Sequence, residues 1–167
     1  MSPLTVLTGT FLLSITLPRL FKREVDYALS ARIAMSVMLL FTAIGHFKFT
    51  DGMELMLPAF IPFKTEVVII TGLIEIGIAI GLLIPSSIKI SGWTLMIFLV
   101  LVLPANIHAA VNHVDFQTAS FDGNGPNYLW FRIPVQLFFI AWAYLSTMDP
   151  CPFSIDLDFG DDDMLFV

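Results

Sequence analysis

The sequence has little cysteine and little charge. Cys151 is the only cysteine, which excludes an intrachain disulfide and a C-x-x-C thiol relay. A free cysteine just after an apolar segment is either inert or a lipidation site, and the sequence leaves both open. Only 13% of the 167 residues are charged, and Lys and Arg number 8. Nucleic acid is therefore not expected as a partner.

Apolar residues are abundant instead, at 57% of the chain. Soluble domains of this length seldom have such a composition, whereas multi-span membrane proteins do. Much of the net charge of −6 lies in the C-terminal tail, DPCPFSIDLDFGDDDMLFV. These features predict a membrane-embedded domain followed by an acidic tail, with the lipid bilayer as a partner.

Five apolar segments follow one another along the chain. Each is close to the ~20 residues that a helix needs to cross a ~30 Å hydrocarbon layer, and none alternates as a barrel strand does. The first is expected to end at Pro18, and it lacks the basic region and cleavage site of a secretory signal. The segments are residues 4–17, 26–47, 66–84, 88–108 and 128–147.

The predicted fold class is therefore all-α. It is a membrane helix bundle with a four-helix core, residues 26–147, preceded by one N-terminal transmembrane helix with a basic turn, residues 1–25. Residues 148–167 form an acidic tail. The tight turn Pro85–Lys89 makes its two flanking helices antiparallel neighbours. The prolines of residues 48–65 forbid one long helix there, so this loop lies on the membrane surface or folds back over the bundle.

The distribution of Lys and Arg predicts the orientation. Arg19, Lys22, Arg23 and Lys89 fall on one side of the membrane, and Lys48 and Lys64 fall on the other. Because short cytoplasmic loops carry an excess of Lys and Arg, the N-terminus is expected outside and the acidic C-terminus in the cytoplasm.

Glu75 lies near the middle of the apolar run VVIITGLIEIGIAIGLLIP. An unpaired charge at the centre of the bilayer costs about 2.5–3.5 kcal/mol on insertion scales, so this carboxyl group must be neutral, paired or facing water. Thr71, Glu75 and Ala79 recur every four residues and define a stripe of small and polar groups on one helix face. This stripe is expected to face the bundle interior.

The other polar residues of the bundle gather in its outer half. Arg132 and Gln136 are the favoured hydrogen-bond partners of Glu75, with His108 next, and the catalytic residues are unknown. The possible polar site comprises Glu75, His108, Arg132, Gln136, Asn106 and His46. Such residues can equally be structural glue between helices.

Metal and haem sites have weaker support in the sequence. His46 and His108 lie at similar depth, which leaves a bis-histidine haem as an alternative. No H-x-x-x-H motif or cysteine cluster is present, so no metal site is expected.

The order GHFKFTDGMELMLPAFIP, TGLIEIGIAIGLLIP, LPANIHAA and YLWFRIPVQ resembles the DoxX family of small integral membrane proteins. The resemblance covers Ala31 to Tyr144, a four-helix core. It implies a multi-pass protein of the bacterial inner (cytoplasmic) membrane with a link to quinone-dependent redox chemistry.

Two functional classes remain open from the resemblance and the residues. The first is an accessory or structural subunit of a larger membrane redox complex, with other membrane-protein subunits as partners. The second is a quinone-interacting subunit of a membrane oxidoreductase, with its polar site in the outer half of the bundle and quinone as the implied cofactor. A small-solute transporter is a third hypothesis with less support, because the chain is short and lacks inverted repeats.

Overall fold

The computed structural model describes residues 2–22 and 24–148. Within these ranges the chain is all-α and contains no β-strand, which confirms the predicted fold class. The acidic tail from residue 149 onward lies outside the described residues. The elements are α1 (Pro3–Leu20), α2 (Tyr27–Lys48), α3 (Thr50–Met56), α4 (Lys64–Gly81), α5 (Ile88–Val111), the 3-10 turn η1 (Gly125–Tyr128) and α6 (Leu129–Thr147).

Four helices are long and apolar enough to cross a membrane: α1, α2, α5, and α6 together with η1. This is the composition of a multi-pass membrane protein. The fifth expected segment, α4, has 18 residues but includes Lys64, Glu66 and Glu75. Lys64 and Glu66 occupy its first turn, so the apolar part of α4 is interrupted only by Glu75.

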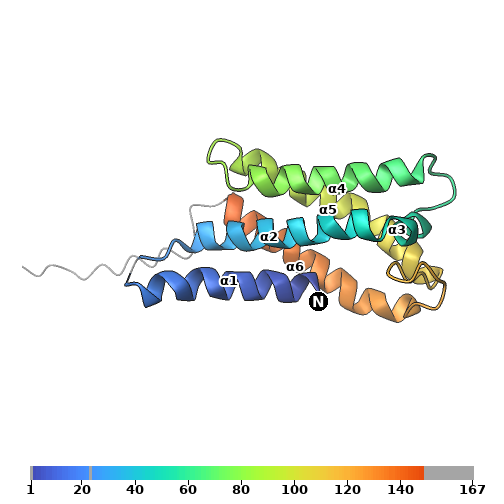
Figure 1. Ribbon diagram of the computed structural model, residues 1–167, viewed down its shortest axis with the longest axis horizontal. Coiled ribbons are helices and arrows are strands. Elements are labelled where there is room, and N and C mark those ends of the chain that lie inside the picture. Colours follow the sequence, from blue (N-terminus) through green and yellow to red (C-terminus); the bar gives the residue numbers. More distant parts are fainter. Residues whose placement is uncertain (1, 23, 149–167) are drawn as a thin grey trace, which may run out of the picture.

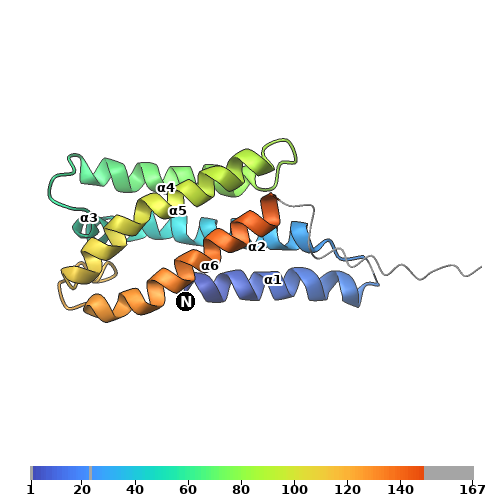
Figure 2. The ribbon, with the colours of Figure 1, turned by 180° about the vertical axis from the view of Figure 1, so that it is seen from behind.

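The bundle is built around α2, which packs between α1 and α4 and also contacts α6 (Figure 1). α5 packs against α4 and α6 on the other side of the molecule (Figure 2). α4 and α5 are antiparallel neighbours joined by a short turn, as predicted, and the hydroxyl of Ser87 donates a hydrogen bond to the carbonyl oxygen of Gly81 across that turn (2.8 Å).

α1 is displaced along the bundle axis. It begins about halfway along α2, and its C-terminal end projects beyond the ends of the other helices (Figures 1 and 2). The expectation that this helix ends at Pro18 was wrong, because it continues to Leu20. A proline in the last turn removes only the N–H that would have bonded Ser14, and the hydroxyl of Ser30 on α2 donates to that free carbonyl oxygen at 3.4 Å.

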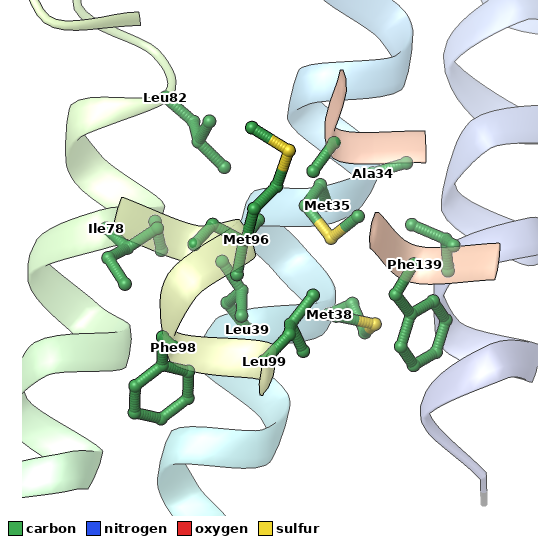
Figure 3. Packing of buried hydrophobic residues seen from close by; sticks show 14 residues of the cluster. Ala34, Met35, Met38, Leu39, Ile78, Leu82, Met96, Phe98, Leu99 and Phe139 are labelled. Atoms are coloured by element: carbon green, nitrogen blue, oxygen red, sulfur yellow. The ribbon is translucent and has the colours of Figure 1, made fainter. Parts of the chain in front are cut away.

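The apolar core fills the half of the bundle at the end where α4 meets α5. Residues from five helices contribute, including Leu7 from α1. Figure 3 shows Met35, Met38 and Leu39 of α2 interleaved with side chains of α4, α5 and α6. Methionine adapts its shape to irregular gaps, which suits a site where helices of different tilt converge.

The opposite end of the bundle, called the α3 end below, is covered by ordered connections. α3 packs on α4 and α5, so the loop of residues 48–65 folds back over the bundle, one of the two expected arrangements. The loop of residues 112–124 is held by an antiparallel bridge between Asp115 and Ser120. The N–H of Gly123 also donates to the carbonyl oxygen of His113 (2.7 Å).

Candidate functional site

Glu75 projects from α4 into the interface with α2. The residue is 7% exposed, so its side chain faces the bundle interior, as predicted. The stripe formed by Thr71, Glu75 and Ala79 also faces α2, since the hydroxyl of Ser36 on α2 donates to the carbonyl oxygen of Ala79 at 2.8 Å. The small residues of α4 thereby bring a carboxyl group against a neighbouring helix without a bulky side chain between them.

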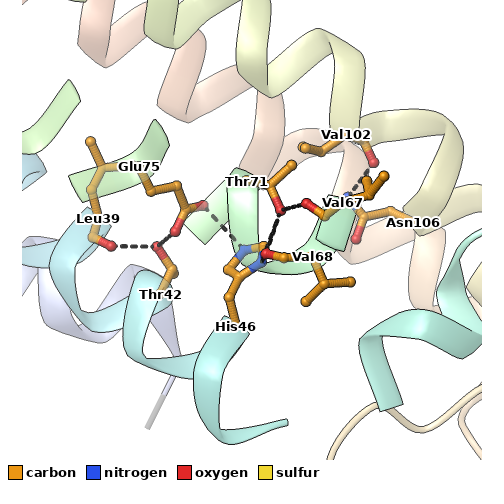
Figure 4. A network of polar contacts seen from close by, with 9 residues as sticks. All are labelled: Leu39, Thr42, His46, Val67, Val68, Thr71, Glu75, Val102 and Asn106. Carbon is orange, nitrogen blue, oxygen red and sulfur yellow. Dashed lines mark hydrogen bonds and ion pairs between the residues drawn. The ribbon is translucent and has the colours of Figure 1, made fainter. Parts of the chain in front are cut away.

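The partners of Glu75 are Thr42 and His46, both on α2 (Figure 4). The hydroxyl of Thr42 donates to Oε2 of Glu75 at 2.9 Å. Nε2 of His46 lies 3.7 Å from Oε1. The favoured partners Arg132, Gln136 and His108 were therefore wrong. The physical reason is that α4 presents its small-residue stripe to α2, whereas Arg132 and Gln136 lie on α6.

His46 is held in one orientation by α4. Its Nδ1 lies 3.1 Å from the carbonyl oxygen of Val68 and 3.2 Å from the hydroxyl of Thr71. The Thr71 hydroxyl itself donates to the carbonyl oxygen of Val67 or Val68. A carbonyl oxygen only accepts hydrogen bonds, so Nδ1 carries a hydrogen and donates. Nε2 is then the ring nitrogen that faces the Glu75 carboxyl group.

Thr42, His46, Thr71 and Glu75 form one polar cluster in a mostly apolar interface. A charge buried in the membrane costs about 2.5–3.5 kcal/mol on insertion scales. The pair of His46 and Glu75 lowers this cost when it holds one proton on Nε2 or Oε1, because its net charge is then zero. The cluster can therefore bind a proton or donate and accept hydrogen bonds.

The remaining predicted site residues do not join this cluster. Three of them have a backbone carbonyl oxygen as their partner. Nδ1 of His108 lies 3.0 Å from the carbonyl oxygen of Met56. Nδ2 of Asn106 donates to the carbonyl oxygen of Val102 at 3.0 Å, and Nε2 of Gln136 donates to that of Leu99. Nε of Arg132 is buried and has no hydrogen-bond partner among the described residues. The structure thus unites His46 with Glu75 and separates the other four.

Thr42 is a residue of the cluster that was not predicted from the sequence. It precedes His46 by four residues, just as Thr71 precedes Glu75 by four, so each helix carries a polar pair on one face. Two such pairs on adjacent helices could have identified Thr42 as a site residue. Gly72 was missed as well. A Cβ at this position would lie 2.9 Å from Cβ of His46, so glycine permits the close approach of α2 and α4 at the cluster.

The fold and the cluster define a small multi-pass helical membrane protein with a buried histidine–carboxylate pair. The chain belongs to a family described as a domain of unknown function (DUF8561), whose model matches residues 35–147. The match begins within α2 and extends to the end of α6, so α1 lies outside it. Comparison with curated proteins and with solved structures finds no match. The resemblance to the DoxX family stays a prediction.

Proposed function

We propose that this chain is an integral membrane accessory subunit that docks onto a larger membrane redox complex. The observation that carries the proposal is the exposed apolar surface of α1, which packs mainly along α2 and leaves most of its circumference uncovered. Leu12 and Leu13 are each more than 60% exposed. The resemblance to the DoxX family supplies the redox part of the proposal.

The junction of α1 with α6 supports a docking role. Two apolar grooves run along it, of about 370 Å³ and 250 Å³. The first is bordered by Leu4, Phe131 and Phe138, and the second by Phe11 and Trp142. Helices associate in membranes by close packing rather than by hydrophobic burial, and a grooved surface offers more packing contact than a flat one.

Photo-crosslinking in native membranes tests the docking role. A photoreactive amino acid at Leu13 should give one discrete adduct with another membrane protein. The matched control is Leu101 on α5, which is 70% exposed and should give only lipid adducts. Identical adduct patterns at the two positions, or no protein adduct at Leu13, would remove the support for an accessory subunit.

A quinone-interacting subunit is the second candidate, and the pairing of His46 with Glu75 favours it. Both groups can donate or accept a hydrogen bond and move a proton, which is what a quinone oxygen requires. The pair can bond one ring oxygen only, and three of the other predicted site residues, Asn106, His108 and Gln136, bond to backbone oxygens elsewhere. A bound quinone would supply the redox chemistry, and this chain would supply the hydrogen bonds.

Substitution of Glu75 by glutamine separates the two candidates. Glutamine keeps the shape and can still accept the Thr42 hydrogen bond, but it cannot carry a proton. A proton-handling site should lose roughly 10²-fold in activity of the associated complex, measured as quinone reduction in membranes. Glu66→Gln is the control, since Glu66 is an exposed carboxylate on the same helix. Unchanged activity in Glu75→Gln with normal assembly would favour the accessory role alone.

The orientation of the chain can be measured directly. A reporter fused after Val167 should be active only in its cytoplasmic form, because the Lys and Arg distribution predicts a cytoplasmic C-terminus. A reporter that needs the periplasm should stay inactive at the same position. Activity of the periplasmic reporter would reverse the assignment and place the α3 end in the cytoplasm.

A further inference from the structure

We infer that His46 and Glu75 form a proton-binding site that exchanges its proton with the α3 end of the bundle only. The site belongs to this chain alone and does not require a partner subunit or a bound quinone. Its ligand is the proton itself. Three features carry the inference: the pairing of the two groups, their isolation from other charges, and the difference between the two halves of the bundle.

The pair can hold one proton in two places. With the proton on Nε2, an imidazolium faces a carboxylate. With the proton on Oε1, a neutral imidazole faces a carboxylic acid. Transfer breaks the N–H bond and forms the O–H bond, and no electron moves. The 3.7 Å separation of the two atoms exceeds a hydrogen bond of about 2.7–3.2 Å, so transfer needs a small approach of the two side chains.

In the described part of the chain, no other charged group forms an ion pair or a hydrogen bond with the pair. Within residues 2–22 and 24–148, His46 and Glu75 make the only ion pair. The polar neighbours Thr42 and Thr71 are neutral. The other charged or imidazole residues of the surrounding helices form no ion pair or hydrogen bond with the site: Arg32, Lys48, Asp51, Glu54, Lys64, Glu66, Lys89, His108 and Arg132. The charge of the site is therefore set by its own proton.

The polar groups of the cluster lead toward the α3 end. α2 and α4 are antiparallel, so His46 and Thr71 lie one helical turn nearer that end than Thr42 and Glu75. The side chain of His46 is 16% exposed, and that of Glu75 is 9% exposed. Figure 4 shows the cluster as a short chain from Thr71 through His46 to Glu75. A proton that arrives from the α3 end meets His46 first.

The half of the bundle between Glu75 and the α4–α5 turn separates the site from that end with an apolar layer. Beyond Glu75 the interface of α2 and α4 is apolar, with Met35, Leu39, Ile78 and Leu82 all less than 5% exposed. Ser36 is the polar side chain of α2 at this level, and its hydroxyl is used by the carbonyl oxygen of Ala79. A proton has no relay through this layer, so the site is closed on that side and does not conduct across the membrane.

Nuclear magnetic resonance of ¹⁵N-histidine-labelled full-length protein in lipid nanodiscs tests the pairing. In the wild type, Nδ1 of His46 should be protonated, and Nε2 should share a proton with the Glu75 carboxyl group. Glu75→Gln should move the Nε2 signal, whereas Glu66→Gln should not. A neutral His46 protonated only on Nε2 in the wild type, or the same Nε2 signal in Glu75→Gln, would overturn the pairing. The wild-type spectrum tests the pairing of His46 with Glu75 even if a variant fails to fold.

Thiol labelling in sealed proteoliposomes tests the one-sided access. Two cysteines are introduced singly in a Cys151→Ser background, Thr71→Cys beside His46 and Ile78→Cys beyond Glu75. A small membrane-impermeant thiol reagent should label position 71 from the α3 end and should not label position 78 from either side. Labelling at position 78 would reveal a path through the apolar layer. Failure to label position 71 would show that water does not reach the pair. Either result would overturn the inference.

Discussion

Replacing Gly72 with alanine should force α2 and α4 apart and lower the free energy of unfolding by about 1–3 kcal/mol. The added Cβ would lie 2.9 Å from Cβ of His46 and 3.3 Å from Cζ of Phe47. Both Cβ atoms are fixed to helix backbones, so rotation of a side chain cannot relieve the contact between them. Movement of the helices would also lengthen the 3.7 Å separation between His46 and Glu75.

The matched control for Gly72→Ala is Gly77→Ala on the same helix. A Cβ at Gly77 meets nothing within 4 Å, and alanine favours a helix over glycine by up to about 1 kcal/mol. This control should therefore be neutral or slightly stabilising. Unfolding is followed by circular dichroism in mixed micelles of increasing sodium dodecyl sulfate content. Equal stability of the two variants would contradict close packing of α2 on α4 at Gly72.

The helices were predictable from the sequence because their signals are local. Each apolar segment became a helix, and the bounds differ by a few residues at the ends. One of these differences concerns the first segment, where Pro18 lies inside α1. Proline is a strong sign of a helix end when its missing N–H leaves a carbonyl group without a partner. Here Ser30 of another helix supplies a donor, which no local pattern could reveal.

The burial of Glu75 was predictable, but its partner was not. A mid-membrane carboxyl group must be buried whatever its neighbours are, because exposure to lipid is costly. The identity of its partner depends on which helix packs against the stripe of α4. The sequence placed His46 and Gln136 on neighbouring elements without saying which of them faces Glu75. The structure selects His46, since α2 rather than α6 packs against this face.

The polar residues outside the cluster have a simpler role. His108 bonds to a backbone oxygen of α3, and Gln136 bonds from α6 to a backbone oxygen of α5. Each therefore joins two elements without meeting another side chain. In a membrane such bonds stabilise helix association by about 0.6 kcal/mol on average. The His108 bond holds α3 on α5, and the Gln136 bond holds α6 on α5.

Replacing Gly52 with alanine should separate α3 from the loop of residues 112–124, which together cover the α3 end of the bundle. A Cβ at Gly52 would overlap the carbonyl oxygen of Phe116 and lie 2.6 Å from its carbonyl carbon. These are backbone atoms, and the loop that holds them is tied to α5 by the bond from Val114 N–H to the carbonyl oxygen of Ala109 (2.8 Å). Either α3 or this loop must move, at a cost of about 1–3 kcal/mol.

The loss of packing should be confined to α3 and its flanking segments, and limited proteolysis can detect it. Trypsin should cleave Gly52→Ala after Lys48 or Lys64 faster than the wild type, because both lysines flank the segment that leaves the bundle. Gly45→Ala is the control, since its Cβ would meet only Cε of Met53 at an ordinary 3.6 Å. A resistant Gly52→Ala would mean that α3 does not rest against the loop of residues 112–124. Faster cleavage in Gly52→Ala alone would identify α3 as a separately opening cover above His46.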